Sequence, residues 1–222
     1  MPRPVNTPVL PILLIAAGLA TALIGCSADP TDAPPPTITP ASAAASPPTA
    51  AAPAGEVRPL AADAQAAIFD AATRALVVLS PSAADDSVVT ILPATGAPAV
   101  QVELDSAAAG LAGDGDGTVF LPTRGGYFRV DVAAGRADRV AVEGREDVDF
   151  TALARRADGR LVLGSADGSV FTLDSEHTVA AQVKIFARVD DIVTQGNTAV
   201  VLDRGQTSVT SLNEDGSDDE LA

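Results

Sequence analysis

From about residue 60 onward, short apolar runs alternate with turn signals. The run 116–121 (DGTVFL) is echoed by 158–163 (DGRLVL), and each is followed by a turn and a second apolar run. The runs are rich in Val, Leu, Phe and Thr, and the Asp-Gly, Gly-Gly and Gly-Asn pairs between them tolerate positive φ. This pattern predicts β-hairpins, with Asp167-Gly168 as the turn between the two middle strands of one unit.

The hairpins repeat along the chain. The second run of each unit ends at Leu92, Val130, Leu173 and Leu212, so the spacings are 38, 43 and 39 residues. A period near 40 with β-type runs is typical of propeller blades. Runs 99–104 and 178–186 alternate with period two, and 151–154 and 191–194 are predicted to be innermost strands. About four strands per unit follow, as a blade requires.

We therefore predict an all-β fold, a small or incomplete β-propeller of about four blades over residues 60–213. Four blades is the lower limit for a propeller. The last unit is expected to stop after its third strand, and 66–69 (AAIF) could supply the missing fourth strand and close the ring. Alternatively, the chain is a shortened propeller that leaves sheet edges open.

One unit supports a family resemblance. Residues 158–174 (DGRLVLGSADGSVFTLD) closely resemble the repeat of pyrroloquinoline-quinone-type propellers, and the other units resemble it loosely. The tryptophan docking motif and the vicinal cysteine pair of that family are missing, so its quinone enzyme function does not carry over. Some relatives are non-enzymatic lipoproteins of the bacterial envelope, and this resemblance implies scaffolding only by analogy.

The N-terminal end has the parts of a lipoprotein leader. Arg3 precedes an apolar run over 9–24, which is short of the length that spans a bilayer. Leu23-Ile24-Gly25-Cys26 resembles the lipobox of bacterial lipoproteins. The resemblance implies that residues 1–25 are a signal peptide and that Cys26 is the lipidation site, with palmitate or a similar acyl chain. The alternative is a permanent membrane anchor with an incidental cysteine.

Two further segments flank the repeats. Residues 26–59 combine the lipidated Cys26 with Pro, Ala, Ser and Thr, and they lack the large apolar groups that offset ordering entropy. We expect a disordered Pro/Ala-rich linker that separates the propeller from the membrane. Residues 214–222 are expected to be a disordered acidic tail, which a basic partner could use.

Composition narrows the possible functions. Arg3 is the only charged residue of the leader, so the chain from Cys26 onward keeps 13 basic and 29 acidic residues, a net charge of −16. Such a surface repels nucleic acid and anionic lipid, and we exclude nucleic-acid binding. Cys26 and His177 are the only cysteine and histidine, and tryptophan is absent. We expect no cofactor.

Several polar positions are candidate site residues. Asp114 and Asp116 resemble part of a calcium loop, although the remaining ligands are absent at the required spacing and a tight turn explains the same residues. Glu146, Asp147 and Asp149, with Asp190-Asp191 one unit later, could ring a central channel or lie in solvated loops. We expect Arg155-Arg156 to be a surface turn pair and His177 to be exposed. No catalytic residues are assigned.

The leading hypothesis is a membrane-anchored extracytoplasmic lipoprotein that acts as a non-enzymatic binding or scaffolding propeller. It would lie on the extracytoplasmic face of the cell membrane, held by its lipid, with a protein partner in the cell envelope. The alternatives are a metal-dependent hydrolase or lactonase, which needs converging acidic or His ligands at the channel, and a small-ligand sensor.

Overall fold

The computed structural model describes residues 57–60, 62–82, 85–213 and 218–219, together with 44–45, 47–48, 51 and 54. All regular secondary structure in these residues is β. The sixteen strands of the described part are, in chain order, β1 (Ala66–Asp70), β2 (Ala75–Pro81), β3 (Ser87–Pro93), β4 (Val100–Leu104), β5 (Ala112–Gly113), β6 (Thr118–Thr123), β7 (Gly126–Asp131), β8 (Arg136–Ala141), β9 (Phe150–Arg155), β10 (Leu161–Ser165), β11 (Ser169–Leu173), β12 (Val179–Lys184), β13 (Asp191–Gln195), β14 (Thr198–Asp203), β15 (Ser208–Leu212) and β16 (Asp218–Asp219).

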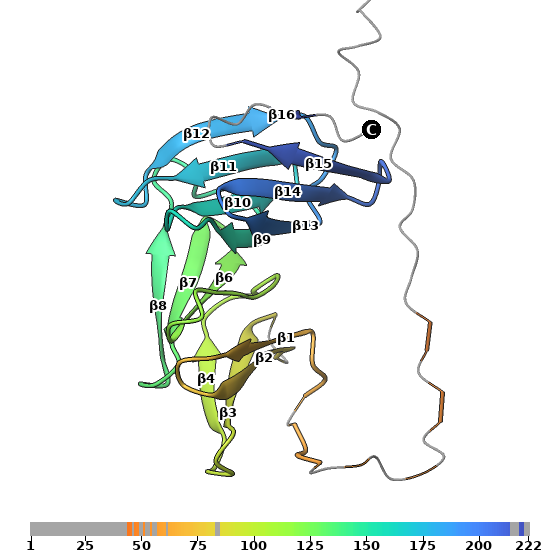
Figure 1. Cartoon of the computed structure of the whole chain (residues 1–222), viewed down its shortest axis with the longest axis vertical. Helices are drawn as coiled ribbons and strands as arrows, with labels where there is room; N and C mark the ends of the chain where they lie inside the picture. Colours follow the sequence, from red (N-terminus) through yellow and green to blue (C-terminus); the bar gives the residue numbers. More distant parts are fainter. Residues whose placement is uncertain are drawn as a thin grey trace, which may run out of the picture. The chain divides into compact units, whose positions relative to one another are not determined.

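These strands form four antiparallel sheets of four strands each, in sequence order within every sheet (Figure 1). The first strands of consecutive sheets, β1, β5, β9 and β13, lie against one another in pairs along the chain. Up-and-down sheets that follow one another with their first strands innermost are the blades of a propeller. The all-β, four-bladed propeller predicted from the repeat is therefore confirmed.

Several local predictions are also confirmed. The innermost runs 151–154 and 191–194 fall in β9 and β13, and the alternating runs 99–104 and 178–186 fall in the outermost strands β4 and β12. Asp167-Gly168 lies in the hairpin between β10 and β11, where Gly168 has a φ of 83°. A Cβ at Gly168 would lie 1.8 Å from the carbonyl oxygen of Phe186, so only glycine fits this turn.

Two predictions about the last blade are wrong. Residues 66–69 do not complete it, because Ala66–Asp70 pairs with β2 over five residues as the first strand of the first sheet. The last sheet also has a fourth strand of its own, since Ser211 and Leu212 pair with Asp219 and Asp218 of β16. The acidic composition of this segment gives no sign of the short strand, because Asp is depleted in strands.

Alternating side chains divide the core into three clusters, one between each pair of consecutive sheets. Val119 and Leu121 of β6 face the first sheet, whereas Phe120 between them faces the third. Likewise Leu163 of β10 faces the second sheet and Val162 faces the fourth. Successive residues of a strand point to opposite faces, so each inner sheet is buried on both sides.

The two end sheets pack against another sheet on one side only, and the outward face of the first sheet is partly covered, since Val78 on it is 2% exposed and Arg58 and Leu60 lie beside it. Among the described residues, no core cluster joins the first sheet to the fourth. The propeller is therefore a row of four blades with two end faces. Within the same residues, no helix combines the length and the apolar character that crossing a bilayer demands.

Polar side chains also link neighbouring sheets. Asp70 at the end of β1 is buried, and its carboxylate accepts the backbone N–H of Gly117 in the second sheet at 3.0 Å. Arg156 is 1% exposed, and its guanidinium donates to the carbonyl of Asn213 at 2.9 Å, after the end of β15. The predicted surface position of Arg156 is therefore wrong, because the packing of the third sheet against the fourth covers it.

Candidate functional site

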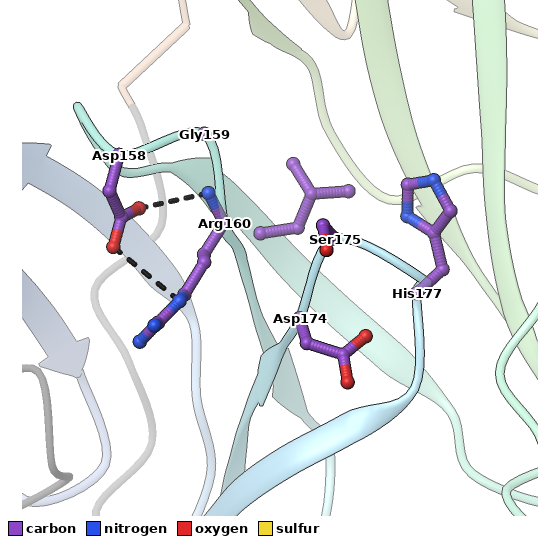
Figure 2. A pocket seen from close by; sticks show the side chains of 7 residues that line it. Asp158, Gly159, Arg160, Asp174, Ser175 and His177 are labelled. Carbon is purple, nitrogen blue, oxygen red and sulfur yellow. Dashed lines mark hydrogen bonds and ion pairs between the residues drawn. The ribbon is translucent and has the colours of Figure 1, made fainter.

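A polar pocket of about 480 Å³ lies at one end of the third sheet, between the β9–β10 and β11–β12 turns. Figure 2 shows Asp158 and Arg160 on one side and Asp174, Ser175 and His177 on the other. Both turns lie at the same end of the sheet because antiparallel strands return to it after every second strand. A volume of this size is in the range of small-molecule sites.

The turn 174–178 is fixed by its first side chain. One carboxylate oxygen of Asp174 accepts the backbone N–H groups of Glu176 at 2.9 Å and Thr178 at 3.0 Å, and the other accepts the Thr178 hydroxyl at 2.6 Å. The hydrogen bonds from Thr178 lower the pKa of Asp174. The Asp174 carboxylate accepts these hydrogen bonds within its own turn. It therefore fixes the shape of the pocket wall, and contacts to a ligand would come from the neighbouring residues.

The same turn occurs at 114–118. Asp114 accepts the backbone N–H groups of Asp116 at 2.8 Å and Thr118 at 2.9 Å, as Asp174 does with Glu176 and Thr178. The structure therefore places the two residues of the calcium hypothesis in an Asp-capped turn before β6. Among the described residues, no group of three or more His, Cys, Asp or Glu side chains is arranged to hold a metal ion.

His177 stands where the equivalent turn has glycine. The fourth position of the turn is left-handed in both copies, with a φ of 96° at Gly117 and 64° at His177. A non-glycine residue in this region costs on the order of 1 kcal/mol or more, so the imidazole must be compensated by its surroundings. Its Nδ1 lies 2.7 Å from the hydroxyl of Tyr127 in β7. The expected exposure of His177 is thus corrected, because the second sheet half-buries it.

The Tyr127–His177 pair has a defined proton arrangement. Burial raises the pKa of Tyr127 to about 12, so its hydroxyl keeps its proton at neutral pH. Tyr127 is completely buried, and buried hydroxyls donate to a partner. We therefore assign Tyr127 as the donor to Nδ1, which places the proton of a neutral imidazole on Nε2. His177 then presents a hydrogen-bond donor beyond the pair.

On the opposite wall, Asp158 and Arg160 hold each other. Asp158 accepts the backbone N–H of Arg160 at 2.9 Å, and its other oxygen lies 3.6 Å from the Arg160 Nε. The Asp158 backbone N–H in turn donates to the Asn197 side chain of the fourth sheet at 3.1 Å. The carboxylates of Asp158 and Asp174 already accept hydrogen bonds from their own turns. The polar groups that remain for a ligand are therefore mainly the hydrogen-bond donors of Arg160, Ser175 and His177.

The acidic residues that the sequence suggested could ring a central channel lie in the loops that connect the blades, where they make separate local contacts. Asp147 pairs with Arg124 at 3.1 Å, and Glu146 accepts the backbone N–H of Gly144 at 3.0 Å. Asp190 accepts the backbone N–H of Arg204 at 2.7 Å and lies 3.4 Å from the Arg188 Nε. These contacts are local to the loops. Asp191 is exposed on β13, and the Arg124–Asp149 bridge involves only backbone.

Cys26, the predicted lipidation site, lies outside the described residues, as do the leader and most of the linker.

Sequence reasoning missed the apolar end faces. On the outer side of the first sheet, Phe69 is 58% exposed and Leu76 is 39% exposed. With Val78 and Leu92 they line a pocket of about 390 Å³, which Arg58 and Leu60 border. On the outer side of the fourth sheet, Val193 and Val209 are 59% and 49% exposed. The alternation in these strands is the same as in the inner sheets, so it gave no signal of exposure.

Comparisons with known proteins extend to the fold. No protein-family model matches the chain, and no curated protein matches it. Among solved structures, it is similar to virginiamycin B lyase from Staphylococcus aureus, with a TM-score of 0.54 and 11% identity over 67% of this chain and 52% of that one. It is also similar to PorZ, a surface component of the type-IX secretion system of Porphyromonas gingivalis, with a TM-score of 0.55 and 17% identity over 72% and 22%.

A third similar structure is a protein of unknown function from Bacteroides thetaiotaomicron, with a TM-score of 0.57 and 11% identity over 71% of this chain and 43% of that one. The chain therefore spans about half or less of the length of these structures. At such identities the likeness is one of fold, and it identifies the described part of the chain as a β-propeller.

Proposed function

We propose that this protein is a lipid-anchored, extracytoplasmic binding propeller whose end faces dock protein. The observation that carries the proposal is the pair of exposed apolar faces, marked by Phe69 and Leu76 on the first sheet and by Val193 and Val209 on the fourth. Exposed apolar groups that gather on one rigid surface are typical of interaction sites. Sheets fix their positions, so a partner meets a preformed surface.

The membrane part of the proposal rests on the sequence. Leu23-Ile24-Gly25-Cys26 resembles a lipobox, and the Pro- and Ala-rich segment after it would carry the propeller away from the bilayer. In this arrangement the lipid supplies the membrane affinity, since the net charge of −16 from Cys26 onward opposes binding to anionic lipid.

Lipidation is tested by metabolic labelling with a palmitate analogue in the native host. We expect label in the wild-type protein and none in Cys26→Ala, while Ser27→Ala serves as the neighbouring control and keeps its label. A Cys26→Ala protein that stays labelled would place the acyl chain elsewhere and contradict the anchor.

Docking is tested by placing a photo-crosslinking amino acid at Leu76 or Val209 in the membrane-bound full chain. Ile185 is the matched control, because it is an apolar residue with 42% exposure outside both end faces. We expect protein adducts at the two end-face positions, several times more abundant than at Ile185. Equal yields at all three positions would refute the end faces as docking surfaces.

A second candidate function, small-ligand sensing, is favoured by the pocket of Figure 2 and by the left-handed backbone of His177. The donors of Arg160, Ser175 and His177 suit a small anionic ligand. Calorimetric titration with a series of short dicarboxylates tests this function. Saturable heat that Ser175→Ala and His177→Asn both abolish would support it, and heat unchanged by either variant would refute it.

A further inference from the structure

The outward face of the first sheet exposes one row of large apolar side chains. Phe69, Leu76 and Leu92 are register partners across β1, β2 and β3. Phe69 is 58% exposed and Leu76 is 39% exposed, whereas Val78 and Thr90 in the next row are buried. The apolar surface that a partner reaches on this face is therefore this one row and not the whole sheet.

A segment of the same chain turns the row into a pocket. Arg58 donates from Nη1 to the carbonyl of Pro93 at 2.9 Å, which holds its segment against the end of β3. Arg58 and Leu60 line the pocket of about 390 Å³ together with the exposed row. Apolar pockets at an interface receive the large anchor side chains that carry most of the binding energy.

The Pro93 end of this pocket is locally positive. Arg58 lines it, and Arg74 lies beside it, because the Arg74 carbonyl accepts the backbone N–H of Ala94 at 2.9 Å and Ala94 lines the pocket. These two arginines are the charged residues of the described segments that meet there, which are 57–60, 71–76 and 92–99. When Glu56, just before the first segment, is included, two positive charges stand against one negative charge. On a chain with a net charge of −15, this end is suited to a carboxylate.

We propose that the partner docked on the first sheet presents a peptide segment in which a large apolar residue lies close to a carboxylate. The apolar side chain enters the pocket beside Phe69 and Leu76, and the carboxylate lies at the Arg58 end. The inference deepens the proposed function, on which it rests, by naming the chemistry of the partner.

Strand spacing sets the separation of the two groups. Phe69 and Leu92 are two strands apart, because β2 lies between β1 and β3. Neighbouring strands are about 5 Å apart, so the row is about 10 Å long, and an extended chain covers this distance in about three residues. We therefore expect the apolar residue and the acidic residue of the partner to be about three positions apart.

The first experiment selects peptides without assuming a partner. The full-length protein in phosphatidylcholine vesicles is exposed to a displayed library of random ten-residue peptides, and the Phe69→Asp variant is exposed to the same library in parallel. We expect the wild type alone to enrich peptides that combine a large apolar residue with Asp or Glu about three positions away. Enriched peptides that are uncharged or basic overturn the inference, as do peptides that both proteins enrich or an absence of enrichment.

The second experiment measures the contribution of the arginine with one enriched peptide, labelled with fluorescein, and with its neutral form, in which Gln replaces the acidic residue. Anisotropy should show an affinity about tenfold lower or less for Phe69→Asp, because a carboxylate is forced into an apolar contact. Arg58→Gln should lower the affinity for the acidic peptide about fivefold and leave that for the neutral peptide unchanged.

The controls separate charge from structure. Arg58→Lys keeps the positive charge and should restore part of the affinity for the acidic peptide. Arg136→Gln alters an exposed arginine of β8 and should leave the affinity unchanged. Unchanged melting temperatures verify that each variant is folded. A loss in Arg58→Gln that is equal for the acidic and the neutral peptide would mean that Arg58 only supports the pocket wall, and it overturns the carboxylate contact.

The failure of this inference differs from that of the proposed function. A photoreactive amino acid at Leu76 identifies the occupant by the mass of its adduct. An adduct with phospholipid, with a second copy of the chain, or with a protein that the acidic peptide does not displace overturns the inference. The last two of these outcomes leave protein docking standing. Equal adduct yields at Leu76, Val209 and Ile185 overturn both.

Discussion

The inner and end sheets of this propeller have the same alternation of apolar residues but differ in how far those residues are buried. Val162 of β10 is fully buried between the third and fourth sheets, whereas Val209 of β15 is 49% exposed on the last face. Both lie in middle strands of four-stranded sheets. The difference therefore comes from the neighbour that each face meets and not from the strand itself. In a repeat protein, the burial of a side chain thus depends on which neighbouring repeat packs against its face.

The largest expected effect is a difference in the stability lost when Val162 or Val209 is replaced by alanine. Val162→Ala leaves a cavity in a packed interface and should cost about 2 kcal/mol of unfolding free energy. Val209→Ala should cost less than about 0.5 kcal/mol, as is usual at an exposed site. Urea unfolding measures both values. Equal costs would show that the fourth face is covered within the single chain.

A second prediction concerns Asp70, which links the first two sheets. Burial raises its pKa, but the hydrogen bonds from Thr73 and from the Gly117 backbone outweigh that effect, and the pKa is lowered overall. A lowered folded-state pKa contributes stability above the ordinary value of about 4, and this contribution is lost as the pH falls through the folded-state pKa.

The Asp70→Asn variant should therefore lose about 1 kcal/mol at pH 7 and then fall less steeply than the wild type on acidification. Urea midpoints between neutral pH and about pH 3 measure the slope. Asp116→Asn, at an exposed turn position, is the control and should follow the wild-type curve. Parallel curves for wild type and Asp70→Asn would exclude Asp70 as the acid-sensitive link.

The third prediction concerns the pair that joins the second sheet to the pocket. Tyr127→Phe removes the hydroxyl 2.7 Å from His177 and should cost about 1 kcal/mol. In the His177→Gly background, where the left-handed backbone is unstrained, Tyr127→Phe should cost a different amount, since its partner is gone. A double-mutant cycle by thermal melting measures the coupling, and a coupling of zero would contradict the hydrogen bond.

The smallest effect is expected from calcium. Asp114 already satisfies its turn, as Asp174 does in the equivalent turn, so millimolar calcium should leave the melting temperature unchanged. Differential scanning calorimetry with and without chelator makes the measurement. A rise in the melting temperature that Asp114→Asn abolishes would restore the metal site.

Much of the fold follows from local patterns. The Asp167-Gly168 turn, the innermost strands and the alternating outer strands were all predictable, because a turn type or a period-two pattern depends on neighbouring residues. The two-residue strand β16 was not predictable, since backbone pairing of Asp218 and Asp219 leaves no trace in apolar periodicity.

The candidate sites were less predictable because they depend on packing between sheets. Tyr127 and His177 are 50 residues apart, and they meet only when the second sheet packs on the third. Arg156 resembles a surface arginine in the sequence and is buried because β15 ends beside it. The end faces were missed for the same reason, since strand patterns state which residues share a face and not what covers that face.

Crosslinking from the end-face positions tests the central claim, that the exposed apolar residues of the end sheets dock protein, most directly. The photoreactive amino acid stands at Leu76 or Val209 in the membrane-bound full chain, and at the comparably exposed apolar residue Ile185 as the control. We predict protein adducts at Leu76 and Val209 that are several times more abundant than at Ile185. Equal yields at all three positions would contradict the account.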